Sequence, residues 1–222
     1  MKKDLSRLDL NRRTRLGMVE AIWGEHKTIE QIASILKKFQ NASEFALVTR
    51  LNDTKSKKLI TQFPSAKLHS NSHCLTLGNP NELKPELGEV IILSGGTSDL
   101  VVASECELAL NIHGIKTELL IDVGVAGLHR LLNQLPKIKK AQVVIACAGM
   151  EGALPTVLAG LIPQPVIGVP VSVGYGVSSN GRACLEGMLA SCAPGLVIVN
   201  IDNGYGAAMA ALRILMLREK VD

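Results

Sequence analysis

The stretch that decides the fold runs from Val90 to Asp99 and reads VIILSGGTSD. Four large apolar residues, three of them β-branched, are followed by Ser94, two glycines and three further polar residues. A short apolar run of this kind is typical of a strand that is buried on both faces of a parallel sheet. The glycines that follow predict a tight turn from this strand into a helix.

The same pattern recurs toward the C-terminus. Further apolar runs lie at residues 119–121, 143–146, 166–169 and 197–201, and helical stretches lie at 101–112, 126–134, 154–161, 182–191 and 207–217. Strands that alternate with helices in this way indicate βαβ units and a parallel sheet. We therefore predict an α/β fold, a flavodoxin-like doubly wound parallel sheet of about five strands.

The composition changes near Gly88, which divides the chain into residues 1–87 and 88–222. The first part is richer in charged residues and poorer in glycine. Apolar residues at helical spacing predict helices over residues 28–39 and 53–63, and residues 45–49 are expected to form a strand. We thus predict a small α+β region ahead of the larger α/β domain.

Bulk properties narrow the class of protein. The 222 residues are 47% hydrophobic, enough for a substantial core, and only 3% aromatic, which argues against platforms that stack single-stranded bases. The net charge of +4 suits anionic small molecules as well as nucleic acid. Because aromatic residues are so few, we expect no nucleic acid as partner, and we expect no membrane either. The five cysteines show no metal-ligand spacing. No signal peptide opens the chain and prolines interrupt its uncharged stretch at 152–181, so a cytoplasmic protein is expected.

Each predicted strand is followed by a loop rich in glycine and polar residues, and in such sheets ligands bind beyond the carboxyl ends of the strands. We call these five loops the rim. Residues 95–99 could hold a phosphate through backbone N–H groups and hydroxyls, or form an ordinary turn; they are neither a P-loop nor a GxGxxG motif. The candidate substrate-binding residues of the rim are Gly95, Gly96, Thr97, Ser98, Asp99, Gly149, Met150, Gly152, Ser172, Tyr175, Gly176, Asp202 and Asn203.

Three further side chains are candidates for chemistry. Glu151 heads the uncharged stretch, where a carboxylate can face a ligand or complement a helix dipole. Asp122 ends the second predicted strand, where its carboxylate can also face a ligand, although with weaker support than Glu151. His129 lies one turn into the next helix, and a lone histidine of this kind is more often structural.

Several strings resemble the LarB family, the pyridinium-3,5-biscarboxylic acid mononucleotide synthases of nickel-pincer cofactor biosynthesis. They are GGTSDL (95–100), DVGVAGLHRL (122–131), AGMEGALP (148–155), PVSVGYG (170–176), GMLASCAPG (187–195) and NIDNGYGAA (200–208). Residues 8–13 and 24–28 resemble the family's opening, so the resemblance covers most of the chain. The catalytic domain of that family is related to aminoimidazole ribonucleotide (AIR) carboxylase, which carries a histidine in an AGxAAHLPG-like string. Residues 148–155 contain no histidine, which argues against the purine reaction.

The resemblance implies a substrate, a reaction and a nucleophile. The substrate would be nicotinic acid adenine dinucleotide, carboxylated at ring C5 by CO₂ and cleaved at its pyrophosphate to release AMP. Cys192 maps to the family's nucleophile, which would add to the ring covalently, and Glu151 is the candidate base. Cys192 should follow the C-terminal end of its helix, away from the rim. Either the helix is shorter and the segment curls inward to the rim, or a neighbouring subunit brings Cys192 there. The resemblance favours the second arrangement, because related carboxylases form octamers with intersubunit sites, so we expect a homo-octamer with Arg182 or His129 as the activating cation.

Other expectations concern the cofactor and the alternatives. Mg²⁺ is expected for the pyrophosphate cleavage, with its ligands unassigned, and no organic cofactor is expected. A purine-type carboxylase or mutase, and a non-catalytic nucleotide-binding regulator with the same loops, are the two alternatives. The role of the N-terminal region stays open, and its Arg12, Arg13 and Arg15 are candidates to grip the adenylate half of the substrate.

Overall fold

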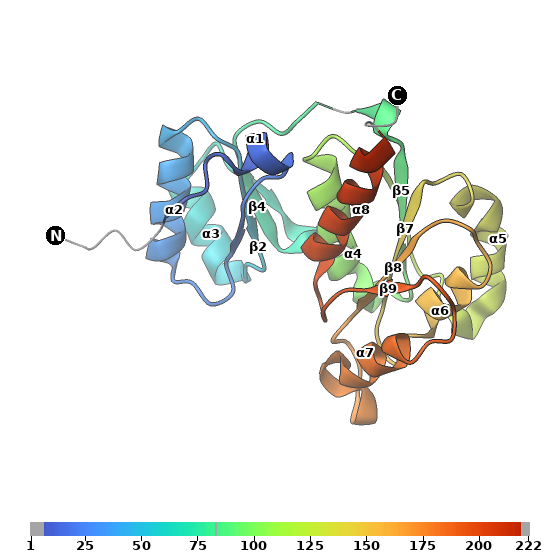
Figure 1. The fold of residues 1–222 in the computed structure, drawn as a ribbon. Helices are drawn as coiled ribbons and strands as arrows, with labels where there is room; N and C mark the ends of the chain where they lie inside the picture. Colours follow the sequence, from blue (N-terminus) through green and yellow to red (C-terminus); the bar gives the residue numbers. More distant parts are fainter. Residues whose placement is uncertain (1–6, 83, 219–222) are drawn as a thin grey trace. The chain divides into compact units, whose positions relative to one another are not determined.

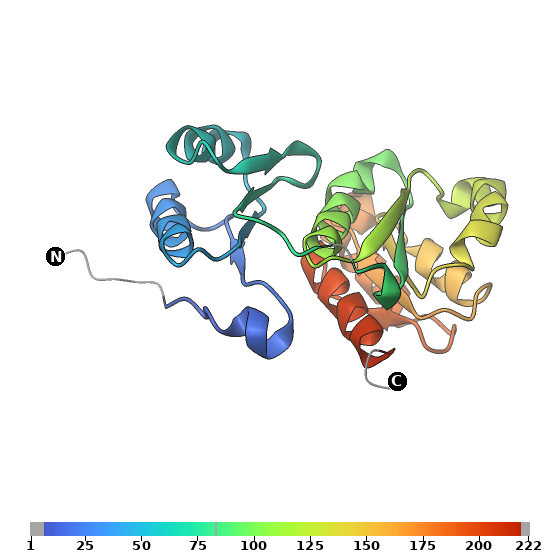
Figure 2. The ribbon, with the colours of Figure 1, turned by 90° about the horizontal axis from the view of Figure 1, so that it is seen from above.

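The chain forms two compact units, residues 1–81 and 82–222, and the computed structural model describes residues 7–82 and 84–218 (Figures 1 and 2). The division lies ahead of the change in composition near Gly88. Residues before Gly88 already bond into the second unit, because the N–H of Lys84 donates to the carbonyl of Gly114 at 2.6 Å. Leu87 is buried there as well.

The N-terminal unit is a small mixed sheet with helices. Its strands lie in the order β1-β2-β4-β3; β1 and β2 are parallel, and β4 is antiparallel to both β2 and β3. The strands are β1 (Ala21–Trp23), β2 (Ala46–Thr49), β3 (Lys67–His69) and β4 (Cys74–Leu77). The helices are α1 (Arg12–Leu16), α2 (Ile29–Asn41) and α3 (Asp53–Gln62), with a short turn η1 (Ser70–Ser72).

Local signals explain where the helices of this unit begin. Thr28 caps α2 through a capping box with Gln31, and the side chain of Asn52 caps α3. The apolar stripe of α2 is buried in the core of the unit. The predicted helices over 28–39 and 53–63 and the strand over 45–49 are confirmed.

The C-terminal unit is a parallel sheet with alternating helices, in the strand order β6-β5-β7-β8-β9. This is the order of flavodoxin-like folds, so the predicted fold class is confirmed. Its strands are β5 (Glu89–Ser94), β6 (Lys116–Leu120), β7 (Val143–Ala148), β8 (Val166–Pro170) and β9 (Val197–Ile198). Its helices are α4 (Leu100–Asn111), α5 (Leu128–Ile138), α6 (Ala153–Ala159), α7 (Arg182–Leu189) and α8 (Gly204–Arg218). Short 3₁₀ turns are η2 (Pro85–Leu87), η3 (Thr97–Asp99), η4 (Val125–Gly127) and η5 (Gly176–Gly181).

The central strands of this sheet are buried on both faces. Ile91, Leu93 and Val144 on one face pack with side chains of α5, α6 and α7. α4 and α8 pack against each other and against the sheet from the opposite side (Figure 1). None of the helices in the described parts of the chain is long and apolar enough to cross a membrane.

The edge strands differ from the predicted ones. β6 begins at Lys116, before the apolar run at 119–121, and β9 covers only Val197–Ile198 of the predicted 197–201. Both lie at edges of the sheet and are partly exposed, so a continuous apolar run is not their signature. α5 also extends through Pro136, beyond the predicted helix end at 134.

The packing of α5 against the sheet generates a stability prediction. Leu131 is fully buried in the core, so Leu131→Ala should lower the free energy of unfolding by about 2–5 kcal/mol. The adjacent Leu132 is 41% exposed, and Leu132→Ala should change it by only about 0.5 kcal/mol. Urea unfolding followed by circular dichroism checks both variants. Equal losses in the two would contradict this packing.

Candidate functional site

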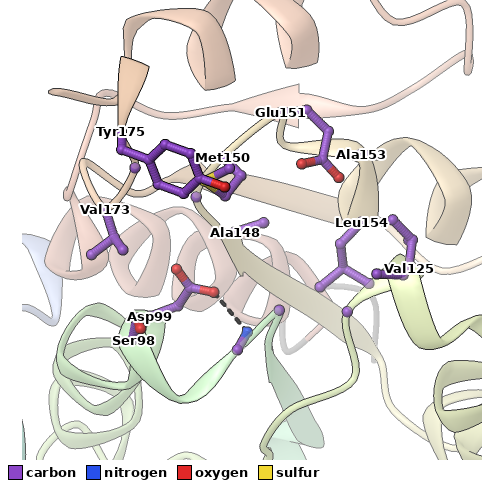
Figure 3. Close-up of a pocket in the computed structure, with 16 residues that line it drawn as sticks. Ser98, Asp99, Val125, Ala148, Met150, Glu151, Ala153, Leu154, Val173 and Tyr175 are labelled. Carbon is purple, nitrogen blue, oxygen red and sulfur yellow. Dashed lines mark hydrogen bonds between the residues drawn. The ribbon is translucent and has the colours of Figure 1, made fainter. Parts of the chain in front are cut away.

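A cavity of about 470 Å³ opens at the carboxyl ends of the strands, on the predicted rim (Figure 3). Its lining comes from the loops that follow β5, β6, β7 and β8 and from the first turn of α6. The predicted residues that line it are Gly95, Gly96, Ser98, Asp99, Gly149, Met150, Glu151 and Tyr175. The structure therefore brings four of the five rim loops together around one space, all but the loop after β9.

Backbone hydrogen bonds between neighbouring loops fix the shape of the cavity. The N–H of Met150 donates to the carbonyl of Val173 at 3.1 Å, which joins the loops after β7 and β8. Gly149 lies so close to the same carbonyl that an added Cβ would stand 2.3 Å from its oxygen. Any side chain at position 149 would therefore push the two loops apart.

Asp99 is a buried carboxylate at the base of the rim, with only 5% of its surface exposed. The N–H of Gly96 donates to its Oδ2 at 2.8 Å. Burial raises the pKa of Asp99, the backbone N–H groups of Gly96, Gly149 and Gly95 oppose that rise, and the charge of Asp202 adds to it. The N–H of Gly96, a candidate to meet a phosphate, is thus engaged by a carboxylate of the same loop.

The charge of the lining favours a cationic ligand. In the view of Figure 3, Tyr175, Met150 and Glu151 lie on one side of the cavity and Asp99 and Ser98 on the other. The described lining contains two carboxylates, Asp99 and Glu151, and no lysine, arginine or histidine. Carboxylates and the face of an aromatic ring both attract positive charge.

Other predicted rim residues stabilise the loops and do not line this cavity. Asp122 accepts from Arg130, and the carboxylate of Asp202 accepts from the N–H of Ser172 at 2.8 Å. Asn203 accepts from the N–H of Gly206 at 2.9 Å, at the start of α8. His129 is exposed on α5. Thr97, Gly152 and Gly176 also lie outside the lining.

The cysteines fall into two classes. Cys192 is exposed, whereas Cys74, Cys106, Cys147 and Cys184 are buried. The Sγ of Cys184 donates to the carbonyl of Ala148 at 2.9 Å, and burial raises the pKa of this thiol to about 11. The contact with Cys147, together with burial, raises the pKa of Cys106 well above its usual range. Only Cys192 therefore has the exposure that a nucleophile needs.

Cys192 lies in the segment that follows α7, outside the cavity lining. The hydroxyl of Thr156 on α6 donates to the Oγ of the adjacent Ser191 at 2.9 Å. The first turn of α6 lines the cavity, so this bond links the cavity wall to the segment that carries the thiol. The candidate cation Arg182 is paired with Glu186 at 2.6 Å.

Sequence reasoning missed part of the lining. The missed residues are small or apolar: Gly124, Val125, Ala126, Ala148, Ala153, Leu154, Val173 and Gly174. All of them lie at the end of a strand, in the loop or turn after it, or in the first turn of α6, so the position of the rim was the signal that could have found them. Because they carry no polar side-chain groups, their residue types alone did not mark them as site candidates.

Neither a metal cluster nor the N-terminal arginines Arg12, Arg13 and Arg15 are found in the described lining of this cavity. Within residues 7–82 and 84–218, no three His, Cys, Asp or Glu side chains gather to hold a metal ion. These residues therefore form no all-protein metal cage, and Mg²⁺, which usually contacts few protein groups, stays a prediction. In the N-terminal unit, Arg13 donates to Asn81 and Arg15 pairs with Asp9.

Comparisons with known proteins cover both units. Residues 2–79 match the family described as LarB/PurE-like N-terminal domain, and residues 89–221 match AIR carboxylase. An uncharacterized protein of Methanocaldococcus jannaschii is 38% identical over 221 residues, 96% of this chain and 85% of that protein. The N5-carboxyaminoimidazole ribonucleotide mutase of the same archaeon is 37% identical over 138 residues, 59% of this chain and 81% of the mutase.

A solved structure agrees with the fold of the C-terminal unit. A variant of PurE2 from Treponema denticola superposes with a TM-score of 0.50 and 24% identity, over 58% of this chain and 80% of that chain. This likeness concerns the fold alone. With both family matches and the full-length relative, the chain is an enzyme of carboxylase or mutase type and belongs to the LarB family.

Proposed function

We propose that this chain carboxylates C5 of the pyridinium ring of nicotinic acid adenine dinucleotide and hydrolyses its pyrophosphate. The products would be pyridinium-3,5-biscarboxylic acid mononucleotide and AMP. Membership of the LarB family supports this proposal. The observation that carries it within the chain is the cavity, whose described lining offers two carboxylates and Tyr175 to a cationic ring and no competing cation.

The purine-type reaction is the second candidate, because the C-terminal unit resembles an N5-carboxyaminoimidazole ribonucleotide mutase. The histidine of the AGxAAHLPG-like string would stand at Ala153, which lines the cavity. A methyl group cannot carry a proton, so the site lacks the proton-transfer group of that reaction. This difference favours the pyridinium reaction.

The proposed chemistry solves an electronic problem. A pyridinium ring is electron-poor and cannot attack CO₂ by itself. When the thiolate of Cys192 adds to a ring carbon next to C5, the ring becomes a dihydropyridine, and C5 becomes a nucleophilic enamine carbon. C5 then forms a bond to CO₂, Glu151 removes the proton from C5, and departure of the thiolate restores the aromatic ring. Water cleaves the pyrophosphate in a separate step that releases AMP.

In this proposal a second copy of the chain delivers the thiol. Cys192 lies outside the cavity of its own protomer, so we propose that a neighbouring subunit supplies it within a homo-octamer. Apolar side chains near the cavity support such an assembly, since Tyr175 is 78% exposed and Val177 is 93% exposed in the single chain. Large exposed apolar groups of this kind mark interaction surfaces.

The reaction itself is the first test. Purified protein is incubated with nicotinic acid adenine dinucleotide and bicarbonate. Mass spectrometry should then detect AMP and a mononucleotide that is heavier than nicotinic acid mononucleotide by one carboxylate. Cys192→Ala should abolish the carboxylated product, because no thiolate is left to activate the ring. Carboxylation of aminoimidazole ribonucleotide in a parallel assay, or normal turnover by Cys192→Ala, would overturn the proposal.

Thiol reactivity tests which cysteine can act. At pH 8 a chromogenic disulfide should react quickly with about one thiol per native chain, since Cys184 stays protonated below its pKa of about 11. Cys192→Ser should remove this fast phase, and the matched control Cys184→Ser should keep it. All five cysteines should react once the chain is unfolded. A fast phase that survives in Cys192→Ser would remove Cys192 as the nucleophile.

Mixed oligomers test the shared site. Glu151→Gln should lower turnover by about 100-fold or more with little loss of nucleotide affinity, because it removes a general base. When this variant is unfolded and refolded together with Cys192→Ala, hybrids contain sites with an intact Glu151 from one subunit and an intact Cys192 from another. The hybrids should then turn over substrate much faster than either variant refolded alone. Hybrids without activity would place both groups on one chain.

A further inference from the structure

The N-terminal unit has an edge at which three chain segments meet. β1 and β2 are parallel, and the register pairs Trp23 with Thr49 at their carboxyl ends. β4 is antiparallel to β2 and begins at the same edge, where the N–H of Leu51 donates to the carbonyl of His73 at 2.8 Å. We call residues 23–28, 50–55 and 73 the Trp23 edge. Open α/β sheets bind ligands at this kind of edge.

Trp23 is exposed at this edge but held in place. About half of it, 48%, is open to solvent. Its Nε1 donates to Oε2 of Glu25 at 3.1 Å, and its ring meets that of His26 edge-on, with 4.9 Å between the centroids. An indole fixed in this way presents a flat apolar face without the entropy cost of ordering a loose side chain.

Cationic side chains share this edge with the indole. Nη1 of Arg50 lies 3.6 Å from the same Oε2 of Glu25, so one carboxylate positions both Trp23 and Arg50. Nζ of Lys55 donates to the carbonyl of Gly24 at 2.8 Å and also contacts that of Glu25. Lys27, Arg50 and Lys55 together outnumber the acidic Glu25 and Asp53 at the Trp23 edge. The edge therefore combines an aromatic face with an excess of positive charge.

The backbone at this edge is strained. Arg50 and His73 both adopt left-handed conformations, with φ of +56° and +51°. Such conformations cost energy for residues other than glycine and cluster at ligand sites. The hydrogen bond from Leu51 to His73 ties the two strained residues together.

We propose that the Trp23 edge binds the adenylate group of a nucleotide, with the purine stacked on Trp23 and the phosphate paired with Arg50. Aromatic faces bind bases by stacking, and a guanidinium matches the geometry of a phosphate. The choice of adenylate rests on the proposed function, whose substrate carries two phosphates, whereas the described lining of the cavity offers no cationic side chain. Free AMP and the adenylate half of the dinucleotide share this chemistry.

Trp23 is the only tryptophan of the chain, so fluorescence excited at a wavelength that tyrosine does not absorb reports directly on this edge. AMP should quench it saturably, and inorganic phosphate or adenosine alone should need at least tenfold higher concentrations. Arg50→Asn should raise the Kd for AMP at least tenfold; asparagine removes the charge and tolerates the left-handed conformation. The matched control Lys37→Asn, on an exposed position of α2, should bind AMP as the unaltered chain does.

A second pair of variants tests the stacking. Trp23→Phe should retain AMP binding in calorimetry, and Trp23→Ala should lose at least tenfold in affinity, with circular dichroism confirming the fold of each. Titration with nicotinic acid adenine dinucleotide shows whether the dinucleotide or free AMP is the tighter ligand.

Two results would overturn this inference: AMP that causes no saturable quenching, or an Arg50→Asn variant that binds AMP unchanged. Saturable AMP binding by a chain that does not carboxylate the dinucleotide would refute the proposed function and leave the adenylate site standing.

Discussion

Burial of β5, β7 and β8 on both faces is the constraint on which the C-terminal unit depends. Helices cover both sides of these strands, so polar groups can reach a ligand only where the strands end. The loops at that rim are then forced into close contact, with Gly149 against the carbonyl of Val173 and the carboxylate of Asp99 bound by the loop that carries it. The cavity is a product of this crowding at the strand ends.

The same constraint explains how much the sequence could predict. Strands buried on both faces leave continuous apolar runs, so β5, β7 and β8 were found, whereas the edge strands β6 and β9 are partly exposed and their bounds were wrong. In the N-terminal unit, β1 and β3 are three residues each, too short for periodicity to detect.

The candidate site shows a similar limit. The loops of the rim could be predicted because they follow the strands. The partners of individual side chains could not: Asp122 and Asp202 occupy rim positions like that of Asp99, yet they bond to Arg130 and Ser172 and lie outside the cavity lining. Sequence spacing places a residue on the rim, but the local hydrogen bonds decide whether it faces the ligand.

The hydrogen bond between Thr156 and Ser191 would matter in the proposed octamer. It joins a helix whose first turn lines the cavity to the segment that carries Cys192. Under the proposed arrangement, filling one cavity would shift the thiol delivered to its neighbour. The sites of the proposed octamer would then be energetically coupled, and saturation with substrate would be cooperative rather than hyperbolic.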